Sequence, residues 1–232
     1  SQKAGAAQVR RSSTLRSKSR PRIADSAYVF ADRAYKASAR GNHADAANAA
    51  RQALRLAPAN RAYRSLLVYE LMASDQLDEA DAVASQAPAV ASAAGTDDEL
   101  TARQKLVRQH IAFRHFDAAN QAMSAGNPDA AVDSARKGIR YAPGLLAHRL
   151  QLIGVLQAAQ QWPEAEQATA DAMRDLGPQP ALLVLRAYGL QRTGQRPAAA
   201  TDLDAALAGA GLNAEDQRNF RLLAADAAMA AA

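Results

Sequence analysis

Small apolar side chains recur along this chain with a constant spacing. With Ala27 as the first position of a 34-residue frame, successive units cover 27–60, 61–94, 112–145, 146–179 and 180–213. Alanine fills position 20 in all of them, at Ala46, Ala80, Ala131, Ala165 and Ala199. It also recurs at positions 8 and 27. Self-similarity at such a period is typical of repeat architectures, in which each unit buries its apolar face against its neighbours.

Turn-forming residues divide each unit in two. Glycine stands at position 15 in Gly41, Gly126 and Gly194, where it turns the chain between two antiparallel helices. Proline at position 32, as in Pro58 and Pro143, ends the second helix because it removes an amide donor. Alanine lets the paired helices approach closely. The pattern predicts an all-α fold of helix pairs.

These residues resemble the tetratricopeptide repeat (TPR) family over 27–213. Gly41, Ala46, Ala53 and Pro58 carry the resemblance in the first unit. Position 4 departs from the family pattern because it holds no tryptophan, and unit two lacks both the turn glycine and the proline. The resemblance implies a right-handed solenoid of about five repeats. It also implies a non-catalytic scaffold that binds a protein or peptide in the concave groove lined by the first helices.

Three segments lie outside the regular units. Residues 95–111 interrupt the frame after the region 25–94, and a capping box at Thr96 to Glu99 predicts one helix over 97–125; a kink at 110–112 is the alternative. Residues 1–24 predict a disordered basic tail, and 214–232 predict a helix that caps the units of 112–213. Because the chain begins with Ser1 rather than Met and both ends look cut, we expect a piece of a longer protein.

The net charge of +5 belongs to the tail, which holds seven basic residues and no acid, so the remaining residues carry −2. A basic nucleic-acid-binding surface on the repeats is therefore not supported; the tail alone remains as an alternative site for nucleic acid or an anionic surface. There are no cysteines and no apolar run long enough to cross a membrane.

The resemblance places positions 2, 5, 9, 12 and 13 of each unit in the concave groove. The candidate partner-binding residues are Tyr28, Tyr35, Tyr69, Phe113, Phe116, Asn120, Gln157, Tyr188, Gln191 and Arg192. Position 9 is tyrosine in three units, and such a column of rings suits stacking on peptide side chains or sugars. The alternative is that these rings fill gaps between neighbouring units.

The sequence offers few candidates for an anion-binding, metal or catalytic site. Basic residues along the long helix, among them Arg103, Arg108 and Arg114, suggest a solvated face with intrahelical ion pairs; docking of an anionic partner is the alternative. His110 and His115 are five apart, which is the wrong spacing for two metal ligands on one helix face. We predict no metal site, no cofactor and no catalytic site, because no pair of groove carboxylates stands out.

The alanine-rich composition loosely resembles that of the TPR regions of bacterial envelope proteins, including exopolysaccharide export scaffolds and the phage N4 adsorption protein. That resemblance implies a periplasmic location, with the cytoplasm as the alternative. It also adds polysaccharide, contacted through Tyr35, Tyr69 and Tyr188, as an alternative partner.

Overall fold

The computed structural model describes residues 22–89, 98–208, 213–215, 218 and 222. The helices of these residues are α1 (Ile23–Ala39), α2 (His43–Leu56), α3 (Arg61–Ala73), α4 (Leu77–Ser85), α5 (Glu99–Ser124), α6 (Pro128–Tyr141), α7 (Leu146–Ala158), α8 (Trp162–Leu176), α9 (Pro180–Arg192) and α10 (Arg196–Ala208). The described residues contain no strand. Most of the predicted tail and of the predicted cap at 214–232 lies outside the described residues, although α1 begins at Ile23, within the range assigned to the tail.

Each unit turns between its two helices in the same way. The residue at position 15 has a positive φ in every unit: Gly41 (75°), Asp75 (63°), Gly126 (75°), Gln160 (58°) and Gly194 (80°). The following amide donates to the carbonyl five residues earlier, as from Asn42 to Ala37 and from Gln161 to Leu156. This is a Schellman motif, and it satisfies the last carbonyls of the first helix. Unit two keeps this turn although it lacks the glycine.

The alanines at position 20 occupy equivalent places in the core. Ala46, Ala80, Ala131, Ala165 and Ala199 are all buried, and so are Ala34, Ala119 and Ala187 at position 8. Small side chains at these points let the second helix of each pair lie close to the first. Shared turns and shared buried positions define a TPR-type solenoid, so the predicted fold class is confirmed.

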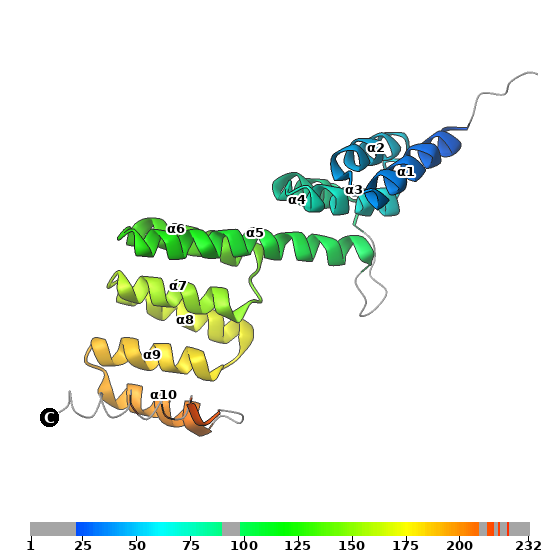
Figure 1. The fold of residues 1–232 in the computed structure, drawn as a ribbon. Coiled ribbons are helices and arrows are strands. Elements are labelled where there is room, and N and C mark those ends of the chain that lie inside the picture. Colours follow the sequence, from blue (N-terminus) through cyan, green and yellow to red (C-terminus); the bar gives the residue numbers. More distant parts are fainter. Residues whose placement is uncertain (1–21, 90–97, 209–212, 216–217, 219–221, 223–232) are drawn as a thin grey trace, which may run out of the picture.

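The long helix α5 is continuous over 26 residues, with no kink at 110–112. Its N-cap is Asp98, which accepts from the Thr101 amide at 3.0 Å and the Thr101 hydroxyl at 2.6 Å, so the helix begins two residues after the predicted cap. Its N-terminal half packs against α3 and α4, and its C-terminal half pairs with α6. Figure 1 shows α1 to α4 above one half of α5 and α7 to α10 below the other. The helix therefore joins two offset stacks.

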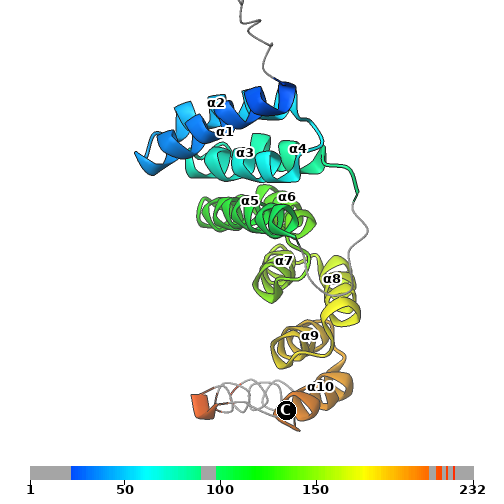
Figure 2. The same cartoon turned by 90° about the vertical axis from the view of Figure 1, so that its right-hand side faces the viewer.

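The first helices α1, α3, α5, α7 and α9 lie on one side of the array. They face the viewer in Figure 1, and α3, α5, α7 and α9 stand to the left of their partners in Figure 2. We call their exposed side the first-helix face. The second helices form the opposite side.

Arginine replaces the family's tryptophan at position 4 in units two and four. Arg64 is buried and donates to the carbonyls of Pro58 (2.9 Å) and Val83 (3.0 Å). Arg149 is buried likewise and donates to the carbonyl of Pro143 at 2.9 Å and to Asp175 at 2.8 Å. Both guanidinium groups thus tie a unit to the proline that ends the preceding one. The fixed fork of donors suits this role.

Candidate functional site

Exposed aromatic rings mark the first-helix face. Tyr28 and Tyr35 of α1 are 65% and 55% exposed, Phe113 of α5 is 57% exposed, and Tyr188 of α9 is 38% exposed. Tyr28 and Tyr35 make no hydrogen bond or ring contact within the described residues. Rings of this size are usually buried against something, so their exposure indicates a surface available for contact.

Tyr69 is held in place by its neighbours. The Arg103 guanidinium lies 4.9 Å from its ring centre, and His43 meets it edge-on at 6.2 Å. Arg103 also donates to the Ser65 carbonyl at 2.9 Å. Tyr35, Tyr69 and Arg103 follow one another at intervals of 34 residues, so the N-terminal half of α5 continues the position-9 column unbroken. Tyr69 therefore packs against its neighbours, as the alternative interpretation expected, although 37% of the residue remains exposed.

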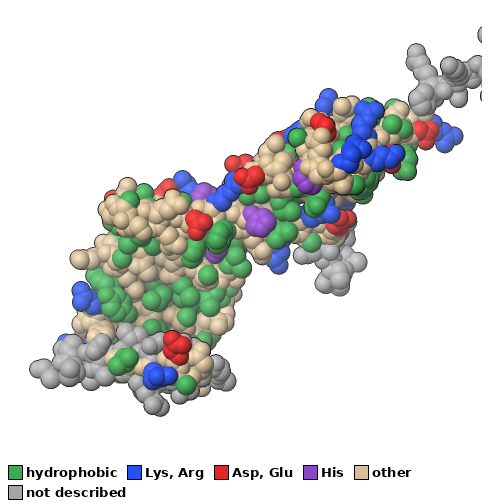
Figure 3. Space-filling model, in the orientation of Figure 1, with side chains coloured by type: hydrophobic (Ala, Val, Ile, Leu, Met, Phe, Trp, Pro, Cys, Tyr) green, Lys and Arg blue, Asp and Glu red, His purple; other side chains and the backbone are tan. Residues whose placement is uncertain are grey.

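The middle of the face is built around Phe116. Phe113 and Phe116 stack with ring centres 6.3 Å apart, and Phe116 also meets His148 at 5.3 Å. Phe116 is half-buried, whereas Asn120, one turn on, is exposed and accepts from the Gln151 amide at 3.0 Å. Figure 3 shows apolar side chains gathered over the lower stack, and charged and histidine side chains along α5 and the upper stack.

Gln157 departs from its expected place. Its side chain is buried and donates to the Leu185 carbonyl at 2.7 Å, tying α7 to α9. Position 12 therefore points toward the next unit at this junction, because the small Gly189 leaves room for it. At the end of α9, Gln191 is half-buried and Arg192 is exposed.

Arginines of α5 tie this helix to the α3–α4 pair, whereas Lys105 and His110 are exposed. Arg108 pairs with Asp81 at 2.8 Å, and Arg114 pairs with Asp75 in the α3–α4 turn. Only Arg103 makes the expected intrahelical pair, with Glu99 at 2.5 Å. Arg61 binds the N-cap Asp98 at 2.6 Å, and this hydrogen bond holds the pKa of the carboxyl well below its usual range. These ion pairs join residues that are far apart in the sequence, so the spacing of the basic residues could not predict them.

Two histidines lie where α5, α6 and α7 meet. His148 is buried, and burial lowers its pKa, an effect that the Ala112 carbonyl only partly offsets. Burial also lowers the pKa of His115, helped by Lys137. His115 stacks on Tyr141 at 5.8 Å. Both imidazoles are therefore packing groups that favour the neutral form.

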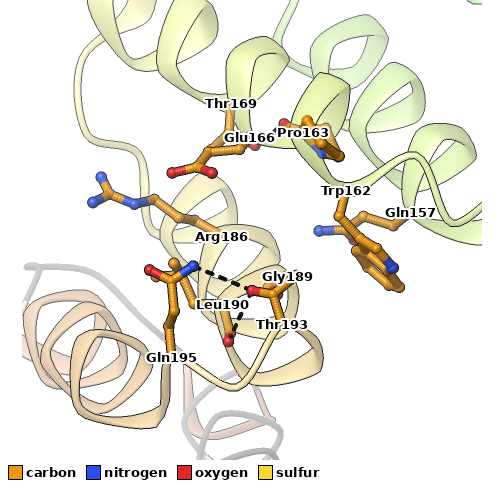
Figure 4. Close-up of a pocket in the computed structure, with 11 residues that line it drawn as sticks. Gln157, Trp162, Pro163, Glu166, Thr169, Arg186, Gly189, Leu190, Thr193 and Gln195 are labelled. Atoms are coloured by element: carbon orange, nitrogen blue, oxygen red, sulfur yellow. Dashed lines mark hydrogen bonds between the residues drawn. The ribbon is translucent and has the colours of Figure 1, made fainter.

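A cavity of about 240 Å³ opens between α8, α9 and the turn after α9. Trp162, Glu166, Arg186, Thr193 and Gln195 contribute polar and aromatic lining (Figure 4). Trp162 also contacts Tyr188 of the first-helix face, with ring centres 6.1 Å apart. No prediction from the sequence included this cavity, because it depends on how two units meet.

The described residues contain no group of three or more His, Cys, Asp or Glu side chains that could hold a metal ion. None of the described helices is both long and apolar enough to cross a membrane.

No protein-family model matches the sequence, and no curated protein matches it significantly. Solved structures with a similar fold include TTC0263, a thermophilic TPR protein of Thermus thermophilus (16% identity, 88% of this chain and 99% of that one, TM-score 0.42). The TPR2AB domain of yeast Sti1 in its pHSP90 complex shares 12% identity, over 88% of this chain and 98% of that one, with a TM-score of 0.47. MamA of Desulfovibrio magneticus RS-1 shares 12% identity over 85% and 98%, with a TM-score of 0.39. At these scores, the assignment of the fold rests on the chain's own repeats.

Proposed function

We propose that this chain is a non-catalytic scaffold whose first-helix face binds an extended segment of a protein partner. The observation that carries the proposal is the exposure of Tyr28 and Tyr35 on one face of α1, seven residues apart and thus two helical turns along the same side. Phe113 and Tyr188 extend the exposed rings to the other stack.

The rings supply a measurable share of binding energy. More than half of each of Tyr28 and Tyr35 is exposed, so covering one ring contributes about 1–1.5 kcal/mol from apolar burial. The phenolic hydroxyls stay available for hydrogen bonds to a partner backbone. Removing both rings is therefore expected to weaken binding by about 30- to 150-fold.

Affinity capture with a tagged chain from the native host tests this proposal. We expect a specific protein to be recovered by the unaltered chain and lost with Tyr28→Ala/Tyr35→Ala. The matched control is Val29→Ala, which removes an equally exposed apolar side chain from the same helix. Loss of the partner with Val29→Ala alone, or its retention by the double variant, would refute a role for the rings.

A polysaccharide is the second candidate partner, because exposed tyrosines also suit stacking on sugar rings. We place the scaffold in the bacterial envelope as part of the same proposal. Recovery of glycan instead of protein, lost with the same double variant, would favour this candidate. Fractionation of the native host, with detection of this chain in each fraction, would test the compartment.

A further inference from the structure

The cavity between units four and five lies at a junction whose residues differ from those of the junction between units one and two. At the junction of units one and two, position 17 is His43, position 9 is Tyr69 and position 10 is Glu70. His43 meets the Tyr69 ring edge-on, and Glu70 is fully buried beneath them with a carboxylate oxygen 2.7 Å from the His43 ring nitrogen. A side chain thus fills this place between the two units.

The junction of units four and five also brings two aromatic rings together, but no side chain of position 10 lies between the units there. Trp162 holds position 17 and contacts Tyr188 at position 9, with the two rings tilted at 57° to each other. Position 10 is Gly189, which has no side chain, and the Gln157 amide of the preceding unit lies close to its α-carbon. A cavity of about 240 Å³ remains, well over ten times the roughly 15 Å³ that one water molecule needs.

The charges around the cavity favour a cation. Glu166 lies on α8 one turn from Trp162 and forms no hydrogen bond or ion pair with the described residues. Arg186 is the other charged group of the lining, and its Nε lies 3.2 Å from the largely buried Asp202. Arg186 is thus paired with Asp202, whereas the Glu166 carboxylate has no ionic partner among the described residues.

The neutral groups of the lining also accept hydrogen bonds. The Thr193 hydroxyl donates to the carbonyl of Gly189 at 3.0 Å and accepts from the Gln195 amide at 3.3 Å. The amide oxygen of Gln195 therefore remains as an acceptor. Trp162 offers an indole ring, the best aromatic surface for a cation.

We propose that this cavity binds the arginine side chain of a protein partner. The planar guanidinium group suits stacking on the Trp162 indole, and the Glu166 carboxylate on the other side of the cavity supplies a negative charge (Figure 4). It carries five donors and no acceptor, which matches a lining with free acceptors at Glu166 and Gln195. The site adjoins Tyr188 but is separate from the exposed rings of α1.

Trp162 is the only tryptophan of the chain, so its fluorescence reports directly on the cavity. Titration of the full chain with N-acetyl-arginine amide is expected to change the emission saturably, with a dissociation constant on the order of millimolar for a ligand of this size. N-acetyl-lysine amide should bind more weakly, and the neutral isostere N-acetyl-citrulline amide should not bind. Equal binding of the citrulline or lysine compound, or no saturable change with the arginine compound, would overturn the proposal.

Two variants localise the effect. Glu166→Gln is expected to weaken arginine binding about tenfold, since it removes the charge-assisted partner. Glu164→Gln, on the same helix but lining a different cleft, should leave it unchanged. An equal loss in both variants would overturn the assignment of Glu166. Tyr28→Ala/Tyr35→Ala should retain arginine binding, so a failure of the α1 rings to bind a partner is distinguishable from a failure of this site.

Discussion

The residue at position 15 has a positive φ in every unit, and substitutions there test the repeat. Replacing glycine and introducing glycine at this position should change the stability of the fold in opposite directions. Gly126 and Gln160 occupy the same position in units three and four, with φ of 75° and 58°. A side chain in this conformation costs about 1–2 kcal/mol, whereas glycine raises the conformational entropy of the unfolded chain and thereby lowers the stability of the fold by about 0.4–1 kcal/mol. A β-carbon built on Gly126 meets no atom within 4 Å, so contacts with neighbours do not confuse the comparison.

We therefore expect Gly126→Ala to destabilise the fold by about 1 kcal/mol and Gln160→Gly to stabilise it by about 0.5 kcal/mol. Gly126→Asn serves as the control, because asparagine tolerates the left-handed region better than alanine and should lose less. Urea unfolding followed by far-UV circular dichroism measures all of these variants. If Gly126→Ala proved neutral, or if Gln160→Gly destabilised the fold, the shared turn would not be under the strain described.

The remaining predictions concern the packed core. Ala131→Leu should destabilise the fold by about 1–3 kcal/mol in urea unfolding because position 20 is fully buried, whereas Ala170→Leu on the exposed side of α8 should be nearly neutral. Arg149→Leu should cost about 2 kcal/mol in the same assay, since it removes the donor that binds both the Pro143 carbonyl and the Asp175 carboxylate. Burial lowers the pKa of His148, so the unfolded chain takes up its proton first as the pH falls below about 6.5. Its contribution to stability is thus complete above that pH and declines below it, by at most ~1.4 kcal/mol per pH unit. Thermal unfolding across this range should show a flatter acid limb for His148→Phe, and an unchanged limb would contradict this sign.

Much of the fold could be predicted because the repeat depends on residue types at fixed positions within each unit. The buried alanines at position 20 and the turn glycines report on contacts within one unit, and both recur with a fixed spacing. Asp75 and Gln160 adopt the same turn without glycine, since the packing of the flanking helices imposes it on them. The long helix α5 could be expected from its uninterrupted run without glycine or proline.

The contacts between units could not be predicted in the same way. Arg64 and Arg149 bind the carbonyl of the proline that ends the preceding unit, and no local pattern distinguishes them from exposed arginines. Gln157 was expected in the groove but is buried, because its direction depends on the empty space above Gly189. The cavity beside Trp162 belongs to the same class of feature. It is visible only when two units are compared at the same repeat positions.

Site-specific photo-crosslinking in the native host tests the proposed function most directly. A benzophenone side chain placed at Tyr28 or Tyr35 should form a covalent adduct with one protein partner, because these rings lie on the face expected to be covered. The same group at Leu56, which is exposed on the second helix α2, should form none. Adducts at Leu56 that match those at Tyr28 and Tyr35, or no adduct at either tyrosine, would contradict binding through the first-helix face.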